Sequence, residues 1–393
     1  MKLKYISATL VFAGLNLAAF AQKVNVKKAF KHAAAQTALL LDEVATSVDP
    51  ARPDLIYPRT VEKENLKLVG SNDWTSGFFP GVVWYLDEFY GTAQWKSAAI
   101  KFTNPIEKEK ANGTTHDLGF MMYCSFGNAY RLTNDPHYKE VVIAAAKTLV
   151  TRFNPKTGVI RSWDHSKDKW ANPVIIDNMI NLELLFEATN LTGDSSFYKI
   201  AVSHANTTMK NHFRSDYSSY HVVDFDPITG KVVTKVTHQG FSNESAWARG
   251  QAWGLYGYTM CYRYTKDPAY LKQAENIAGF ILTHPNMPKD MVPYWDFNAP
   301  GIPNEPRDAS AAAVLASGLY ELSKYSAEHK YYTKKADQIL ANLSTDYIAS
   351  PGSAKGFILV HSTGNKPVNN EIDVPINYAD YYYLEALIRC KNK

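Results

Sequence analysis

One polar segment recurs along the chain at nearly even intervals. Residues 130–138 read YRLTNDPHY and residues 262–270 read YRYTKDPAY, and looser copies occupy residues 188–198 and 322–331. In the two closest copies, Asp followed by Pro is typical of a helix start. The Asp caps free N–H groups, and the Pro lacks an N–H that the first turn leaves unpaired. The repeat therefore predicts helical hairpins of about sixty residues each, loops included.

The apolar stretches around these segments predict about twelve helices in six pairs. They are expected to start near Val24, Gly77, Thr92, Asp117, Pro136, Ile175, Ser195, Ala246, Pro268, Ala309, Glu328 and Asn377. Hairpins that cannot each bury their apolar face alone either close into a ring or stack into an open superhelix. The last helix has no polar outer face, which favours closure. We predict an all-α fold, an (α/α)6 barrel, as a single domain over residues 22–393.

Strand signals are few in this chain. Residues 221–225 and 231–237 flank the turn sequence DPITG at 226–230. This pattern predicts one surface hairpin.

The first 21 residues have the pattern of a secretory signal peptide. Lys2 and Lys4 precede a mostly apolar stretch, and residues 19–21 form a small-x-small cleavage site. The residue directly after that site is Gln22 and not a Cys, which argues against a lipid anchor. We predict a signal peptide at residues 1–21 and export of the mature chain to a bacterial periplasm.

Charge and cysteine content exclude several classes of protein. The formal charge of +4 includes Lys2 and Lys4, so the mature chain carries 4 − 2 = +2, with no long basic run. Nucleic acid is therefore not an expected partner. No later stretch approaches the roughly 20 apolar residues of a membrane span. Cys124, Cys261 and Cys390 form no disulfide framework, and the first two are expected to be buried thiols.

Polar and aromatic side chains gather at the starts of alternate predicted helices. The positions are Asp73, Trp74, His116, Asp117, Asp177, Asn178, Trp247, Arg249, Trp253, Arg307, Asp308, Tyr378 and Asp380. Alternate helices of a ring run the same way, so these residues should meet at one rim. Helix N-termini carry positive dipole ends, which favour an anionic ligand. The pattern predicts one pocket for an acidic, ring-shaped molecule.

The segment WARGQAWG at residues 247–254 is the most distinctive of these starts. Arg249 offers a planar fork for a carboxylate, and the two Trp residues offer flat faces for a sugar ring. Gly250 and Gly254 lower helix propensity, which indicates close packing or ligand approach. The alternative is a tightly packed buried helix with a structural Arg. Asp117 and Asp177 have a structural alternative as well, as helix N-caps.

Motifs for metal, nucleotide or acyl-transfer chemistry are absent from the sequence. There is no HExxH, no paired Cys motif, no Gly-rich phosphate loop and no GxSxG elbow. We therefore expect no metal and no cofactor.

Five blocks of the sequence resemble a known family. They are DWTSGFFPG at 73–81, HDLGF at 116–120, DNMINLELL at 177–185, WARGQAWG at 247–254 and DYYYLEAL at 380–387. Together they resemble the unsaturated glucuronyl hydrolases, glycoside hydrolase family 88, over essentially the whole mature chain. The sister family of unsaturated rhamnogalacturonyl hydrolases shares the barrel and stays the alternative. It usually carries Asn-Gly where this chain has Gln251-Ala252.

The resemblance implies roles for particular residues. Asp177 would be the acid/base and Asp117 the second essential carboxylate. The residues implied to contact the substrate are Trp74, Phe78, His116, Trp163, His221, Gln239, Trp247, Arg249 and Trp253. Residues 361–366 fall where relatives bind the leaving sugar. Arg249 is one candidate to hold the substrate carboxylate, and other donors stay open.

The resemblance also implies a reaction. The substrates would be unsaturated glycosaminoglycan disaccharides or short oligosaccharides of chondroitin, hyaluronan or heparin type, which are products of polysaccharide lyases. The enzyme would hydrate the vinyl ether bond of their 4,5-unsaturated glucuronic acid, without a cofactor. A non-catalytic periplasmic glycan-binding protein on the same barrel is a third interpretation. The presence of both Asp117 and Asp177 argues against it.

Overall fold

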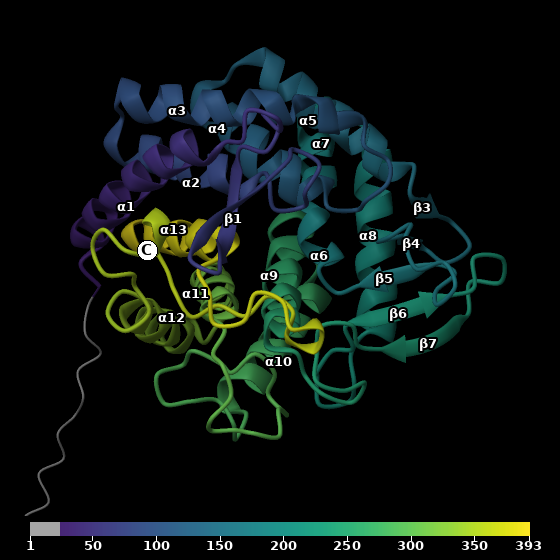
Figure 1. The fold of residues 1–393 in the computed structure, drawn as a ribbon. Helices are drawn as coiled ribbons and strands as arrows, with labels where there is room; N and C mark the ends of the chain where they lie inside the picture. Colours follow the sequence, from purple (N-terminus) through teal and green to yellow (C-terminus); the bar gives the residue numbers. More distant parts are fainter. Residues whose placement is uncertain (1–23) are drawn as a thin grey trace, which may run out of the picture.

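The computed structural model describes residues 24–393, and the predicted signal peptide at residues 1–21 lies outside them. Within this described part, helices alternate between an outer and an inner ring (Figure 1). The outer helices are α1 (Val26–Ser47), α3 (Ala93–Thr103), α5 (Pro136–Val150), α8 (Ser195–Asn211), α10 (Pro268–Thr283) and α12 (His329–Leu343). The inner segments are α2 (Phe78–Tyr90), η2 with α4 (Gly119–Gly127, Asn128–Thr133), α6 with α7 (Asn178–Asn181, Glu183–Thr192), α9 (Ala248–Thr265), α11 (Ala309–Leu322) and α13 (Asn377–Lys391).

The inner ring is closed. α2 contacts η2, η2 contacts α7, and both α6 and α7 contact α9. α9 packs on α11, α11 on α13, and α13 returns to α2. The purple α1 lies beside the yellow α13, so the two ends of the barrel sequence meet (Figure 1). The predicted (α/α)6 barrel is confirmed, and the open superhelix is excluded.

Local capping decides where several helices begin. Asp135, Asp194 and Asp267 each accept a hydrogen bond from a backbone N–H in the first turn of the helix that follows. Pro136 and Pro268 occupy first turns, as predicted. Because these signals are local, the observed helix starts lie within about three residues of the predicted ones.

Two inner helices are less regular than predicted. η2 is a π-helix, and the next inner helix is divided into α6 and α7. The two irregular segments touch, because the Phe120 N–H donates to Oδ1 of Asn181 at 2.8 Å. A Cβ on Gly119 would come within 2.4 Å of the Asn181 Cα, so glycine is required for this close approach. The contact couples the two segments that begin next to the predicted carboxylates.

Short strands and 3-10 turns complete the fold. Their bounds are β1 (Tyr57–Glu62), β2 (Asn65–Val69), β3 (Phe153–Asn154), β4 (Val159–Ile160), β5 (Pro173–Ile175), β6 (Val222–Phe225), β7 (Val232–Val236), η1 (Asn104–Ala111), η3 (Ala354–Gly356) and η4 (Lys366–Val368). β6 and β7 form the predicted hairpin, and β5 pairs antiparallel with β6. The β1–β2 hairpin goes beyond the prediction. Lys63 and Glu64 turn it at positive φ, without the Gly or Asn that usually marks such a turn.

Cys124 and Cys261 are buried free thiols, as predicted. Among residues 24–393, no helix combines the length and apolar character that crossing a membrane requires.

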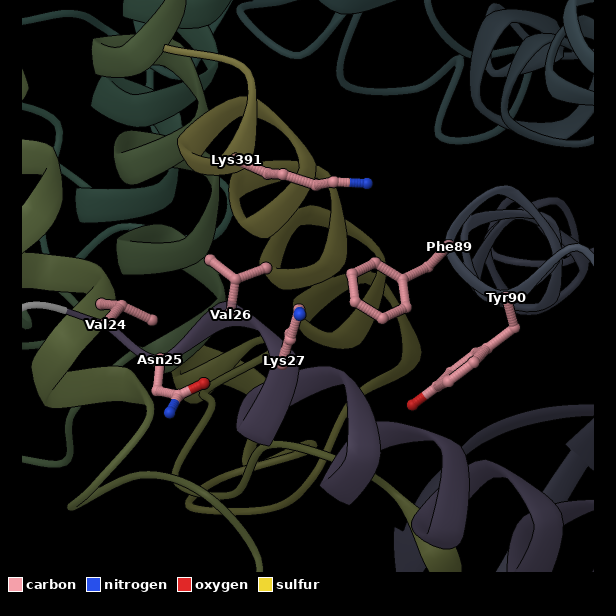
Figure 2. Close-up of a pocket in the computed structure, with 7 residues that line it drawn as sticks. All are labelled: Val24, Asn25, Val26, Lys27, Phe89, Tyr90 and Lys391. Carbon is pink, nitrogen blue, oxygen red and sulfur yellow. The ribbon is translucent and has the colours of Figure 1, made fainter.

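A cavity of about 820 Å³ lies at the end of the barrel where α2 and α13 finish. Val24, Val26, Phe89 and Tyr90 supply apolar surface, and Lys391 reaches over the Phe89 ring at 5.0 Å (Figure 2). The predicted site residues lie at the opposite ends of the inner helices, so this cavity is separate from them.

Candidate active site

A cavity of about 470 Å³ opens at the end of the barrel where the inner helices begin. Five inner segments each place a side chain in its wall. These are Trp74 before α2, Asp117 before η2, Asp177 before α6, Arg249 in the first turn of α9 and Tyr378 in the first turn of α13. The partial positive charges of helix N-termini favour an anionic ligand here. Five of the six predicted helix starts therefore meet at this cavity, and the sixth, at Arg307 and Asp308 before α11, does not line it.

Asp177 lies in the inner wall of the cavity, with a side chain that is 9% exposed. Burial raises the pKa of Asp177 to about 7, against the lowering effect of Arg249, and the negative charge of Asp117 adds to the rise. The nearby Trp253 indole also acts to lower the pKa of Asp177. A carboxyl group with this pKa is substantially protonated near neutral pH, as a general acid requires.

Asp117 supplies the second carboxyl group of the cavity. Thr115 Oγ1 donates to Asp117 Oδ2 at 2.8 Å and accepts from the Asp117 N–H at 3.1 Å. His116 Nε2 lies 3.4 Å from Asp117 Oδ1, and burial lowers the pKa of His116. The imidazole is therefore neutral at neutral pH, and the local loop holds Asp117 in place.

Aromatic rings form part of the cavity wall. Trp74 lies against Phe78 and Tyr378, with ring centroids 5.9 and 5.2 Å apart. Trp163, from the loop before β5, stacks on His165 at 5.0 Å. Flat apolar faces beside polar groups suit a sugar ring, which has an apolar face and a polar edge.

Arg249 is buried, at 1% exposure, and its fork is already engaged by the protein. Nη1 donates to Asp308 Oδ2 and to the Thr363 carbonyl, both at 2.6 Å, and Nη2 donates to the Gly364 carbonyl at 2.6 Å. The guanidinium also lies over the Trp247 ring at 4.6 Å. From its sequence context, Arg249 was expected to offer a fork to a ligand carboxylate. The structure shows it binding a carboxylate of its own chain and the main chain of residues 363–364.

We expect Arg249→Lys to lower kcat/KM by about 10- to 100-fold, because one ammonium cannot donate to Asp308, Thr363 and Gly364 in the same planar geometry. Steady-state kinetics with an unsaturated disaccharide measures this effect. The matched control is Arg161→Lys, because Arg161 makes a more exposed ion pair with Asp164 outside the cavity wall. Equal activity of Arg249→Lys and the wild type would show that activity does not depend on the planar contacts of Arg249 with Asp308, Thr363 and Gly364.

The structure separates the predicted site residues into two groups. The residues that line the cavity are Trp74, Asp117, Trp163, Asp177, Gln239 and Arg249. The residues that lie behind its surface, each no more than 3% exposed, are Phe78, His116, His221, Trp247 and Trp253. The second group shapes the wall in this structure and does not form its surface, because each of these rings packs against other aromatic or charged side chains.

Asp380 was also expected at the rim, and here the structure corrects the prediction. Its carboxylate accepts the N–H groups of Ile358 and Leu359 at 2.9 and 2.8 Å, and it is buried away from the cavity. Burial raises the pKa of Asp380 to about 8. Asp380 therefore anchors the loop before α13, and of the two residues only Tyr378 lines the cavity.

One side of the cavity is closed by residues that no sequence motif indicates. Arg59, on β1, makes ion pairs with Glu371 at 2.5 Å and with Asp73 at 2.9 Å. The yellow loop before α13 thereby meets β1 over the barrel (Figure 1). Asn365 and Asn370 line the cavity from the same loop. No motif surrounds Arg59, and its partner lies 312 residues away, so the sequence offers no signal for this contact.

A buried carboxyl group with a pKa near neutrality, a second carboxylate beside it and aromatic walls define the class of the protein. Most glycoside hydrolases use a catalytic pair of carboxyl groups whose environments differ. Among the described residues, no group of three or more His, Cys, Asp or Glu side chains is arranged to hold a metal ion. The fold and the site are those of an (α/α)6-barrel glycosidase.

Comparisons with known proteins agree with this class. No family model matches the chain. The chain is 54% identical over 342 residues to an unsaturated glucuronyl hydrolase of Formosa agariphila, covering 86% of this chain and 85% of that protein. It is 32% identical over 359 residues to an unsaturated chondroitin disaccharide hydrolase of Streptococcus pyogenes, covering 89% of each. A crystal structure of an unsaturated glucuronyl hydrolase specific for heparin superposes with a TM-score of 0.88 at 49% identity, covering 93% of this chain and 97% of that one.

The chain belongs to the unsaturated glucuronyl hydrolases, glycoside hydrolase family 88. The resemblance found in the five sequence blocks is confirmed, and the protein is a glycosidase.

Proposed function

We propose that this enzyme removes the 4,5-unsaturated glucuronic acid from the non-reducing end of glycosaminoglycan oligosaccharides. The observation that carries the proposal is Asp177, a buried acid of the cavity wall with a pKa of about 7, next to the charge of Asp117. The names of the relatives support the substrate class, because they are hydrolases of unsaturated glucuronyl and chondroitin products.

The proposed reaction is hydration of a vinyl ether. Protonated Asp177 delivers its proton to C4 of the double bond, and positive charge develops at C5 and the ring oxygen. Water then adds its oxygen to C5 and returns a proton to the Asp177 carboxylate. The resulting hemiketal opens to an α-keto acid, and the leaving sugar departs with a hydroxyl group. General acid and base catalysis by one carboxyl group contributes about 10²–10⁴-fold to such a rate.

The cavity suits the anionic substrate in two ways. The helix N-termini point partial positive charge at the cavity, whereas the charge of Arg249 is already paired with that of Asp308. Gln239 donates from Nε2 to the Gly364 carbonyl at 3.1 Å, and this hydrogen bond links it to the loop at residues 361–366. We propose that this loop contacts the leaving sugar, because Gly364 and Asn365 line the outer part of the same cavity.

The test is loss of the ultraviolet absorbance of the conjugated double bond when the protein is added to an unsaturated disaccharide. Unsaturated chondroitin, hyaluronan, heparin and rhamnogalacturonan disaccharides are compared in parallel. Turnover of one or more glycosaminoglycan products is expected. Turnover of the rhamnogalacturonan product alone would favour the sister activity, and binding without loss of absorbance would favour a glycan-binding protein.

We expect Asp117→Asn to move the alkaline limb of the pH profile to lower pH. Activity falls as Asp177 loses its proton, so the limb follows its pKa of about 7. Removing the neighbouring negative charge makes ionisation of Asp177 easier and lowers that pKa. The profile is measured on the residual rate of the variant. A limb that stays in place or moves to higher pH would contradict the coupling of the two carboxyl groups.

We further propose that the protein is exported, on the basis of Lys2, Lys4 and the apolar stretch that follows them. Cell fractionation of a producing bacterium tests this. Recovery of the chain in the periplasm with its N-terminus at about residue 22 is expected.

A further inference from the structure

Two buried polar atoms without hydrogen-bond partners face each other behind the cavity. Nε2 of His221 and Oδ2 of Asp177 are 3.7 Å apart, and neither makes a hydrogen bond. Both side chains are almost fully buried, at 1% and 9% exposure. A buried polar atom left unpaired costs free energy, so two such atoms 3.7 Å apart need only a small shift to form a hydrogen bond. Hydrogen bonds at active sites are often long in the free enzyme and tighten when substrate binds.

The other ring nitrogen of His221 decides which way the imidazole donates. The backbone N–H groups of His238 and Gln239 both donate to His221 Nδ1, at 3.1 Å each. A nitrogen that accepts hydrogen bonds cannot carry a proton in the neutral ring, so the proton must be on Nε2. The loop at residues 238–239 therefore holds one tautomer, with its N–H directed at Asp177.

We propose that His221 is a positioning residue that donates its Nε2 proton to Oδ2 of Asp177 and so directs the acidic proton to Oδ1. Oδ2 is the buried oxygen, whereas the Asp177 side chain also reaches the cavity surface, which leaves Oδ1 as the oxygen that faces substrate. The inference deepens the proposed function and rests on Asp177 being the acid. The His221 proton itself is not transferred in any step.

The charges around the pair are consistent with a neutral imidazole. Burial lowers the pKa of His221 well below its usual value, and nearby His238 and Arg249 act in the same direction. His212 and His116 also lower the pKa of His221.

The acid faces its own set of charged groups. Arg249 lowers the pKa of Asp177, and Asp117 raises it. Because His221 is neutral, its donated N–H stabilises the carboxylate form without an ion pair that would hold Asp177 ionised. The geometry thus lets Asp177 remain an acid near neutral pH and still presents one defined oxygen.

A protonated carboxyl group can carry its hydrogen on either oxygen, and the two positions differ here in the contacts they allow. With the proton on Oδ2, the O–H of Asp177 and the Nε2–H of His221 would face each other, and neither of these two buried donors would have an acceptor. With the proton on Oδ1, Oδ2 accepts from His221 and both buried atoms are satisfied. When the proton has moved to C4, the free Oδ1 is the base that receives a proton from water. One oxygen then performs both steps.

The first experiment is NMR of the full-length mature protein labelled with ¹⁵N-histidine, without substrate. We expect His221 to show the Nε2–H tautomer throughout the pH range of activity. His204 is an internal control, since its Nδ1 also accepts a backbone N–H, from Ile160 at 3.0 Å. Asp177→Asn should shift the His221 Nε2 resonance and leave that of His204 in place. An Nδ1–H tautomer, an imidazolium, or no response to Asp177→Asn would overturn the proposal.

The second experiment compares two variants by kinetics on the unsaturated disaccharide that the wild type hydrolyses fastest. We expect His221→Leu to lower kcat by about 10- to 100-fold, because the acid proton is no longer directed to one oxygen. It should also move the alkaline limb to higher pH, since a donor to the charged form is lost. We expect His221→Gln, which can place an amide N–H near the same point, to recover part of kcat and to return the limb toward the wild-type position.

The two experiments separate failure of this inference from failure of the proposed function. If the wild type hydrolyses none of the disaccharides, the proposed function fails, and the tautomer and the response to Asp177→Asn still test the contact. If His221→Leu lowers kcat while the alkaline limb stays in place, His221 is a packing residue and the inference is overturned.

Discussion

Asp177→Asn is expected to lower kcat by about 10²–10⁴-fold, the largest effect on activity of any single change in this site. An amide has nearly the shape of the carboxyl group, but it cannot donate a proton to C4 and then accept one from water. The variant should fold, because burial already favours a neutral group at this position. Loss of the ultraviolet absorbance of an unsaturated disaccharide measures the rate, and thermal unfolding reports the fold.

Asp380→Asn is the matched control for this change. Burial raises the pKa of Asp380 as well, to about 8, but its carboxyl group holds the Ile358 and Leu359 N–H groups outside the cavity. We expect Asp380→Asn to keep activity within about tenfold of the wild type. Activity of Asp177→Asn within about tenfold of the wild type would exclude Asp177 as the acid and base.

Asp308→Ala is expected to have the largest effect on stability, lowering the free energy of unfolding by about 3–5 kcal/mol. Asp308 and Arg249 form an ion pair at 2.6 Å in which the side chains are 0% and 1% exposed. Removing Asp308 leaves a buried guanidinium without its counter-charge. It also removes the N-cap of α11, where Asp308 accepts from the Ser310 and Ala311 N–H groups, which costs about a further 1 kcal/mol.

Urea denaturation measures the change, with two comparison variants. Asp308→Asn keeps a capping oxygen and removes the charge, so its loss should be smaller than that of Asp308→Ala. Asp373→Ala breaks the ion pair with His361, in which both side chains are about half exposed, and should cost no more than about 1 kcal/mol. A loss for Asp308→Ala equal to that for Asp373→Ala would show that the buried pair does not stabilise the barrel.

Much of the architecture was predictable because its signals lie within a few residues of one another. Asp135 and Asp267 cap their helices in the structure as their Asp-Pro sequences indicate. The β1–β2 hairpin was not predictable, because Lys63 and Glu64 adopt positive φ without a residue type that favours it. The π-helix η2 escaped prediction for a related reason: the Phe120 contact that accompanies it is made with Asn181, in another inner segment.

Some residues of the candidate site were predictable from the sequence, and others were not. The sequence indicated that Trp74, Asp117, Asp177 and Arg249 would meet at one rim, because each is near the start of an inner helix. It did not indicate Arg59, whose ion pairs join β1 to the loop before α13.

The sequence by itself determined the helix starts, the six-hairpin repeat and the gathering of polar residues at one end of the barrel, since these depend on local capping and on the direction in which successive helices run. Only the tertiary structure decided the chemical state of those residues. The pKa of Asp177 depends on burial by the whole ring, the partner of Arg249 is 59 residues away, and the tautomer of His221 depends on backbone N–H groups 17 and 18 residues away. Burial and hydrogen-bond direction are properties of the packed chain, so they exist only once the barrel has closed.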